Sequence, residues 1–347
     1  MLNASPNRAP GLAIAALFLA GSVAFSAPVA PAAAPAPAAA RPQMPAITQP
    51  VMFNTPEADK ILAALQVFPA DNPWNEDISQ RPVLKNSVEM ISLIGPGKRL
   101  AYNLDMAFIF VPGDQKKVDV KLLAYPAESD KGPYPMPDNA PVEGWPLDGR
   151  SLAAAQAGKE DTDRHVIVVD PVNRMLYEFY QGRKTPAGWE SACEATFDLK
   201  SNRLRPDGWT SSDAAGLPIF PAIIRYDEVE RGMVEHAMRF TVHNTRNAYV
   251  YPATHRASRK TDPNLPRMGE RFRLKANYDI SSFSPHVQAI LKGLKKYGMF
   301  VADNGGDWRL SVAPDKRIKG LDELGRLKGA DFEVVEPTGP NEGPRGH

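Results

Sequence analysis

Short apolar runs alternate with breaks of Gly, Pro and Asp between Val83 and Ala124. Runs of this length, separated by turn-forming residues, are typical of strands in antiparallel sheets. We therefore expect strands at Met90–Ile94, Met106–Val111 and Val118–Leu123.

The clearest hairpin pattern lies in the middle of the chain. His165–Asp170 (HVIVVD) and Met175–Tyr180 (MLYEFY) are separated by a short turn-forming segment. The first run is apolar on both faces, which predicts a central, buried strand. Glu190–Leu199 is expected to add a neighbouring strand.

A second hairpin is expected between two strands whose outer ends carry histidines. If Asn244–Asn247 (NTRN) forms the turn, counting outward along both strands places His236 opposite His255. Alternation then gathers an apolar, aromatic face that ends in these two imidazoles. The other members of that face are Met238, Phe240, Val242, Tyr249, Tyr251 and Ala253.

Two helices have clear start signals. Thr55 precedes Pro56 and Glu57, which supplies an N-cap, a preset first turn and an acidic N-terminus. Ser284 and Pro285 open the strongest helical pattern of the chain. Its apolar stripe consists of Val287, Ile290, Leu291 and Leu294.

Strand patterns also dominate the C-terminal part. Met299–Ala302 and Trp308–Val312 are expected to run as a pair around a turn, and a small helix at Leu321–Leu327 precedes a last strand at Phe332–Val335. No internal repeat is present. We predict a mainly β fold, either an antiparallel β-sandwich or a distorted barrel with a few peripheral helices.

The ends of the chain do not resemble domain sequence. Arg8 precedes an uncharged apolar run that small residues follow, the order found in a secretory signal peptide, and the run is shorter than the roughly 20 residues of a spanning helix. We expect export to the periplasm or the medium, without stable membrane insertion after signal cleavage. The expected divisions are a signal peptide at 1–27, an Ala/Pro-rich linker at 28–50, a single β-rich domain at 51–336 and a flexible tail at 337–347.

Composition narrows the class of partner. The chain holds 41 Lys plus Arg against 40 Asp plus Glu, so nothing electrostatic favours nucleic acid. Cys193 is the only cysteine, which excludes an intrachain disulfide. We expect it to be a small buried thiol in a strand rather than a nucleophile.

The stretch Arg205–Glu228 follows neither the helical nor the strand period. Small residues flank one carboxylate, Asp213, and two prolines stiffen the apolar run behind it. Long irregular segments inside compact domains are usually functional, which favours a site loop. A well-packed connector with a turn aspartate is the alternative.

Several catalytic motifs are absent from the sequence, among them a GxSxG elbow, a Walker loop, HExxH and a dinucleotide fingerprint. Carboxylates, histidines and aromatics remain, and in an exported, strand-rich chain they suggest polysaccharide chemistry. Glycosidic cleavage uses two carboxyl groups that flank the bond. We expect Asp213 to be one of them and Asp227 or Asp303 the other, although Asp303 also precedes a common turn pair. Glu228 is adjacent to Asp227, so only one of the two can face a given cleft.

Aromatic and basic residues are the candidates for substrate binding. Tryptophan supplies flat surfaces on which sugar rings stack, although core packing is its commoner role. The substrate-binding candidates are Trp209, Tyr226, Tyr251, Arg239 and Trp308.

The histidine pair supports a competing chemistry. His236 and His255 could act as acid and base, or could bind a metal with His165 or Asp170 as a third ligand. In a lyase, a histidine or Tyr226 would abstract a sugar-ring proton while an arginine neutralised a uronate carboxylate. A structural role at a strand end is the commoner fate of a histidine.

Several segments together resemble a family of exported, largely uncharacterised bacterial proteins. They are FPADNPWN, DRHVIVVD, GWTSSDAAGLPI, RYDEV and YGMFVADNGG, and the resemblance extends from Phe68 to about Pro314. It implies export but no activity, and no catalytic residue is carried over from it.

The sequence as a whole predicts a secreted, carbohydrate-active enzyme that hydrolyses a polysaccharide or cell-envelope glycan with an acidic pair, without a cofactor or a metal. One alternative is a non-catalytic glycan-binding or envelope-structural protein. The other is a metal-dependent enzyme or lyase that uses His236 and His255.

Overall fold

Five strands form an open mixed sheet in the order β1-β3-β5-β6-β9. The computed structural model describes residues 41–160 and 162–337. The strands of this sheet are β1 (Val51–Met52), β3 (Phe108–Phe110), β5 (Val166–Asp170), β6 (Met175–Tyr180) and β9 (Cys193–Asp198). The predicted hairpin is confirmed, because β5 and β6 pair antiparallel. The central, buried position of β5 is confirmed as well.

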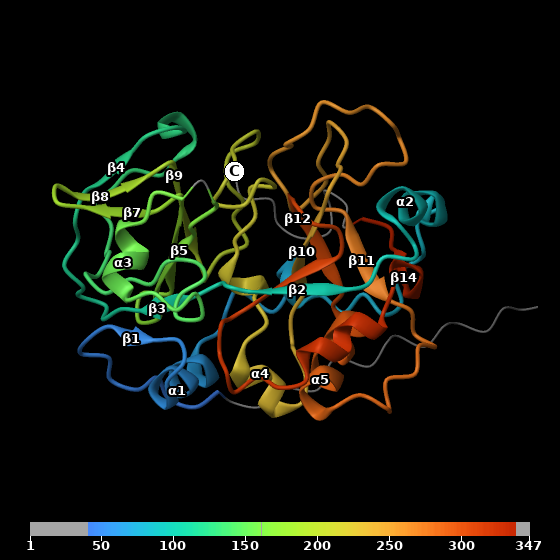
Figure 1. Cartoon of the computed structure of the whole chain (residues 1–347), viewed down its shortest axis with the longest axis horizontal. Coiled ribbons are helices and arrows are strands. Elements are labelled where there is room, and N and C mark those ends of the chain that lie inside the picture. Colours follow the sequence, from blue (N-terminus) through green and yellow to red (C-terminus); the bar gives the residue numbers. More distant parts are fainter. Residues whose placement is uncertain (1–40, 161, 338–347) are drawn as a thin grey trace, which may run out of the picture. The chain divides into compact units, whose positions relative to one another are not determined.

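A small sheet and two helices lie beside this sheet (Figure 1). The small sheet has the order β4-β8-β7 and consists of β4 (Val120–Leu122), β7 (Arg183–Thr185) and β8 (Gly188–Ser191). Helix α3 (Leu152–Ala157) contacts β7. Helix α1 (Pro56–Ala64) begins as predicted, since the Thr55 side chain accepts a hydrogen bond from the Ala58 N–H.

Six strands form the second large sheet in the order β14-β11-β12-β10-β13-β2. Helix α5 (Pro285–Lys296) buries its predicted apolar stripe and contacts β11. Helices α2 (Ser87–Ile94) and α4 (Tyr226–Arg231) contact β14 and α5, respectively. The strands are β2 (Ala101–Leu104), β10 (Met238–Val242), β11 (Arg271–Leu274), β12 (Met299–Asn304), β13 (Arg309–Val312) and β14 (Phe332–Val334).

Five short 3₁₀ turns connect these elements within the described residues. Leu321–Arg326, expected as a small helix, is one of these turns, and the last turn, Gly329–Asp331, directly precedes the predicted last strand, β14. The turns are Pro73–Asn75, Pro126–Glu128, Phe220–Ala222, Leu321–Arg326 and Gly329–Asp331.

The predicted antiparallel sandwich or barrel is wrong. The described residues form three mixed sheets, each with at least one parallel pair, and none closes into a barrel. Parallel strands need long connections, so their pairing cannot be recognised from the turn next to a strand. Helices make up a larger part of the described fold than the few peripheral helices that were expected. Met90–Ile94, which was expected to be a strand, lies in helix α2.

The second predicted hairpin is also wrong. Strand β10 pairs with β12 in parallel and with β13 antiparallel, so Asn244–Asn247 does not join two paired strands. Strand β10 also lies between β12 and β13, so the expected pairing of Met299–Ala302 with Trp308–Val312 is wrong. The central position of β10 was not recognisable from alternation, because every residue of the strand is buried.

Tryptophans anchor the core of the six-stranded sheet. Trp308 is fully buried, and its ring stacks on Phe240 and Phe332 at centroid distances of 5.8 and 5.3 Å. Trp74 is buried, and its ring lies 5.1 Å from that of Phe300. Trp308 therefore has no surface on which a substrate could stack, contrary to its prediction as a substrate-binding residue.

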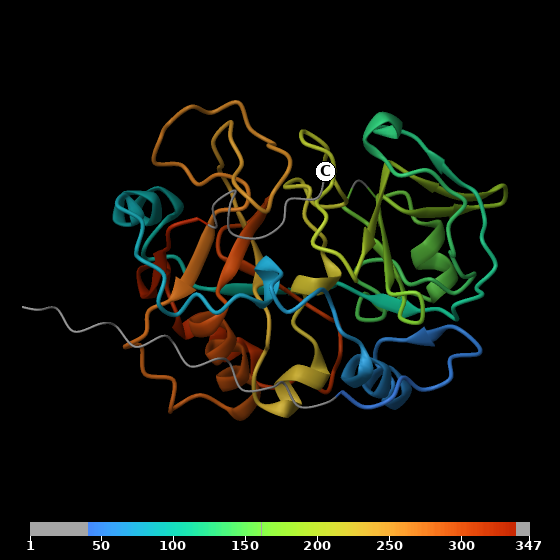
Figure 2. The same cartoon turned by 180° about the vertical axis from the view of Figure 1, so that it is seen from behind.

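The segment that follows β9 is irregular up to the 3₁₀ turn at Phe220–Ala222, as predicted, but the predicted stretch extends too far, because its last residues, Tyr226–Glu228, lie in α4. It runs between the two large sheets, where Figures 1 and 2 show it in yellow. The Ile219 and Phe220 N–H groups donate to Glu178 of β6, and the Ala215 N–H donates to the Ala302 carbonyl of β12. Both sheets thus hold the segment through its backbone.

The expected signal peptide and most of the expected linker lie outside the described residues, as does the tail beyond residue 337. From Arg41 to Pro50 the chain has no helix or strand, but Met44 and Ile47 pack against an apolar cluster that includes α1. Within residues 41–160 and 162–337, no helix has the length and apolarity to cross a membrane.

Two glycines of the irregular segment permit a direct test of its packing. Gly216 has φ +74° and Gly208 has φ +84°, so alanine at either site costs about 1–2 kcal/mol. A Cβ at Gly216 would lie 2.0 Å from Thr254 Oγ1, whereas none lies near Gly208. We expect G216A to lower the free energy of unfolding by roughly 1–3 kcal/mol more than G208A in urea titrations. Equal losses would show that the segment is loosely packed.

Candidate functional site

A cavity of about 320 Å³ opens next to the irregular segment. Its walls come from the strands β6, β9 and β12, from the irregular segment and from the chain around His255. The lining residues are Tyr125, Asp163, Tyr180, Cys193, Thr210, Ser211, Ser212, Ala214, His255, Ala257, Asp303 and Asn304.

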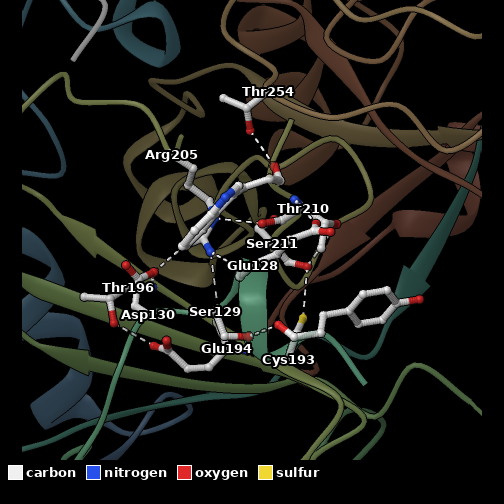
Figure 3. Close-up of polar contacts among 12 residues, drawn as sticks. Glu128, Ser129, Asp130, Cys193, Glu194, Thr196, Arg205, Thr210, Ser211 and Thr254 are labelled. Atoms are coloured by element: carbon white, nitrogen blue, oxygen red, sulfur yellow. Dashed lines mark hydrogen bonds and ion pairs between the residues drawn. The ribbon is translucent and has the colours of Figure 1, made fainter. Parts of the chain in front are cut away.

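Arg205 holds one wall of this cavity in place, as Figure 3 shows. Its buried guanidinium donates to the Thr210 carbonyl at 2.7 Å, to Asp130 at 2.5 Å and to the Glu128 carbonyl at 2.7 Å. The Glu128 carboxylate in turn accepts from the Thr210 N–H at 3.0 Å. Because these bonds are charge-assisted, they fix the start of the irregular segment against the 3₁₀ turn Pro126–Glu128 and against Asp130.

Cys193 also lines the cavity, but it is not an activated nucleophile. Its thiol donates to the Ser211 carbonyl at 3.3 Å, and burial raises its pKa to about 12 (Figure 3). A thiol with such a pKa carries almost no thiolate at neutral pH. The expectation of a buried thiol in a strand is confirmed.

Asp213 lies beneath the cavity and not in it. Its fully buried carboxylate accepts two hydrogen bonds from Arg239, from Nε at 2.7 Å and from Nη2 at 2.5 Å. Arg239 also donates to the Ser311 hydroxyl of β13. Burial disfavours the charge on Arg239, yet Asp213 holds its pKa above the ordinary value.

The predictions for Asp213 and Arg239 are thereby corrected. Sequence analysis expected a free acid at Asp213 because no neighbour in the chain could pair with it, but the partner comes from β10. Arg239 is engaged on the same pair and is not available to bind substrate.

Asp303 is the predicted acid that does line the cavity. Burial, and after it the negative charge of Asp213, raises its pKa to about 8 although Arg239 opposes the shift. Its carboxyl group accepts from the Asn304 N–H at 2.6 Å and, more weakly, from the Ala214 N–H at 3.4 Å. At neutral pH it is therefore mainly a neutral carboxylic acid that can donate a proton.

His255 also lines the cavity, and its imidazole can supply a hydrogen-bond acceptor where Asp303 supplies a donor. Its Nδ1 lies 2.7 Å from the Ala214 carbonyl, which can only accept, so Nδ1 carries a hydrogen and, in a neutral imidazole, Nε2 is the acceptor. Ser212 adds a buried hydroxyl that has no hydrogen-bond partner among the described residues. The cavity thus offers a proton donor, an acceptor and an unused hydroxyl.

A group of buried ionisable residues lies near the Arg239–Asp213 pair. Burial raises the pKa of Glu178 to about 8, and burial together with the charge of Glu143 raises that of Asp105 to about 7. Burial lowers the pKa of His165 to about 4, so its imidazole is neutral. Sequence analysis missed Glu178, although an acid inside the apolar run MLYEFY was a usable signal.

His236 belongs to a different cluster from His255. Its Nε2 lies 3.0 Å from Glu228, and Arg225 pairs with the same carboxylate at 2.8 Å. Burial disfavours the charge of Glu228, but Arg225 and His236 together lower its pKa to about 2. The predicted pair of facing imidazoles is wrong, because the hairpin that would have opposed them does not form.

Asp227 and Tyr226 also lie away from the cavity. Both stand on α4, where Asp227 is buried and pairs with Arg231 at 2.7 Å. Arg317 covers the ring of Tyr226 at 3.9 Å from its centroid. Neither residue lines the cavity with Asp303.

The remaining aromatic predictions are corrected in part. Tyr251 is buried and does not line this cavity, while Trp209 is half-buried beside the Arg205 guanidinium. The aromatic residues that do line the cavity are Tyr125 and Tyr180, which sequence analysis did not select. Asp163 was missed as well, although it stands directly before the predicted strand in DRHVIVVD.

In the described part of the chain, no group of three or more His, Cys, Asp or Glu side chains is arranged to hold a metal ion. Comparisons with protein-family models, with curated proteins and with solved structures found no match.

The buried ion pair provides a stability prediction. D213N leaves Arg239 charged, buried and without its counter-ion, so we expect a loss of about 3–5 kcal/mol in the free energy of unfolding at pH 7. Urea titration followed by circular dichroism measures it. The exposed Asp119 is the matched control, because D119N should change stability by less than about 0.5 kcal/mol.

Replacing both partners with apolar residues should recover much of this loss. In the double variant D213L/R239M no charge remains uncompensated, so we expect it to be more stable than D213N. A double variant that is less stable than D213N would contradict the assignment of the cost to an unpaired charge.

Proposed function

We propose that the protein hydrolyses a glycosidic bond of a polysaccharide in the 320 Å³ cavity, with Asp303 as the general acid and Asp163 as the second carboxyl group. The observation that carries the proposal is the raised pKa of Asp303, about 8, on a residue that lines an open cavity. An acid that keeps its proton at neutral pH beside a substrate-sized space is what glycosidic cleavage requires.

The proton of Asp303 would pass to the glycosidic oxygen as the bond to the anomeric carbon breaks. Asp163 lines the same cavity and is exposed, so it is available either as the base toward an attacking water or as the nucleophile. Burial, and after it the charges of Asp163 and Asp303, raises the pKa of Tyr180, so both acids lie near that side chain. Tyr125 and Tyr180 supply ring surfaces for sugar packing.

Asp213 keeps a supporting role in this proposal. Its charge contributes to the raised pKa of Asp303, and Arg239 holds it in position. It is a positioning residue, since it is fully buried and cannot reach a substrate.

A non-catalytic glycan-binding protein is the second candidate. A neutral carboxylic acid donates a hydrogen bond to a sugar hydroxyl as readily as it donates a proton, and the two tyrosines serve binding equally well. The metal-dependent alternative loses its pair of ligands, because His236 pairs with Glu228 while His255 contacts the Ala214 carbonyl in the cavity. Export remains part of the proposal and is supported by the pattern of residues 1–27.

The first functional prediction concerns Asp303. D303N keeps the size and planar shape of the side chain but removes the acidic proton. We therefore expect the release of reducing ends, from a polysaccharide that the wild type cleaves, to fall by about 10²–10⁴-fold. D119N is the control and should retain full activity. Release that D303N leaves unchanged would refute the role of Asp303, and binding without release by the wild type would favour the second candidate.

The second functional prediction concerns pH. Because the acid form of Asp303 is needed, kcat/KM should fall as pH rises through about 8. Stability should behave in the same sense: the raised pKa means that the folded state holds a proton which the unfolded state has lost between pH 4 and 8. The free energy of unfolding due to Asp303 therefore decreases over that range, by up to about 1.4 kcal/mol per pH unit.

D303N should lack this contribution. Urea titrations of the wild type and D303N between pH 4 and 8 measure it, and the stability difference should shift steadily in favour of D303N as pH rises. A difference that is constant with pH would show that Asp303 titrates at its ordinary pKa.

A further inference from the structure

A second, open depression of about 450 Å³ lies beside the cavity. Ala257 lines both hollows, so the two are neighbours along the surface. The depression is lined by Asn247, Arg256, Ala257, Ser258 and Arg259.

The two arginines of the depression form no polar contact within the described residues. Arg256 and Arg259 are exposed, and neither forms a hydrogen bond or an ion pair with any residue in 41–160 or 162–337. The arginines around the cavity are different, since Arg205 and Arg239 are buried and fully paired. The acid nearest in the chain, Asp262, has its carboxylate on the Asn264 N–H.

Two free guanidinium groups on the wall of a shallow hollow are suited to carboxylates. The planar guanidinium offers parallel N–H groups that match the two carboxylate oxygens. The net charge of the chain is only +1, so this positive region is local and not an effect of the whole molecule. Asp303 adds little repulsion at neutral pH, because it holds its proton.

We propose that this depression is a subsite for a carboxylate-bearing sugar, and that the polysaccharide substrate therefore contains uronic acid units. This inference rests on the proposed function. Asp163 places a carboxylate in the cavity itself, and this carboxylate would repel a charged sugar there. The charged sugar therefore lies next to the cleaved bond, in the depression lined by Arg256 and Arg259.

Binding is measured on the inactive D303N variant, so that turnover does not enter. The probes are polygalacturonate, alginate and hyaluronan, and fully methyl-esterified polygalacturonate is the neutral control of matched backbone. We expect at least one of the three carboxylated polymers to bind 10-fold or more tightly than the ester, with an affinity that decreases with added salt.

The role of the arginines is tested by adding R256Q/R259Q to that variant. It should weaken binding of the carboxylated polymer by 10-fold or more and leave binding of the ester unchanged. The control K116Q/K117Q removes the same charge from exposed lysines that line neither hollow, and it should have no comparable effect.

Two results would overturn the inference. One is the absence of any preference for a carboxylated polymer over the ester, and the other is an equal loss of affinity in the control variant. Failure of the proposed function is recognised separately, because wild-type protein that binds a carboxylated polymer through the arginines but releases no reducing ends retains the subsite and loses the hydrolase activity.

Discussion

The structure depends on one buried charge pair, Arg239 with Asp213. Arg239 comes from β10 at the middle of the six-stranded sheet, and Asp213 comes from the irregular segment, so the pair joins the segment to the sheet. Two buried charges are tolerated only when their hydrogen bonds are nearly all made. Here both carboxylate oxygens accept from the guanidinium, whose third nitrogen donates to Ser311.

The same pair sets the electrostatics of the cavity. Burial makes ionisation of Asp303 less favourable and raises its pKa, and the negative charge of Asp213 adds to that effect, whereas Arg239 partly offsets it. Asp213 accepts two hydrogen bonds from an arginine, whereas Asp303 accepts only from backbone N–H groups among the described residues, and burial raises its pKa. A division of roles between two nearby carboxyl groups, produced by their surroundings, is a common way to obtain an acid that works at neutral pH.

Local signals in the sequence were sufficient for several elements. The N-cap at Thr55, the stripe of α5 and the alternation around the β5–β6 hairpin depend on residues close together in the chain, and all three predictions are confirmed. The irregular segment was recognised for the same reason. The strand pairing was predicted wrongly where the partners are distant in the sequence. The pattern of β10 suggests one strand of a hairpin, but its neighbours in the sheet are β12 and β13, which come much later in the chain.

The sequence by itself determined which residue types are available: unpaired-looking acids, a stretch without a regular period, and no familiar catalytic motif. It also identified Asp303 and His255, both of which line the cavity. Only the tertiary structure decided which acid is paired and which is free, because Asp213 finds Arg239 across the sheet and not along the chain. A pKa depends on burial and on charges within a few ångströms, and those neighbours are created by folding.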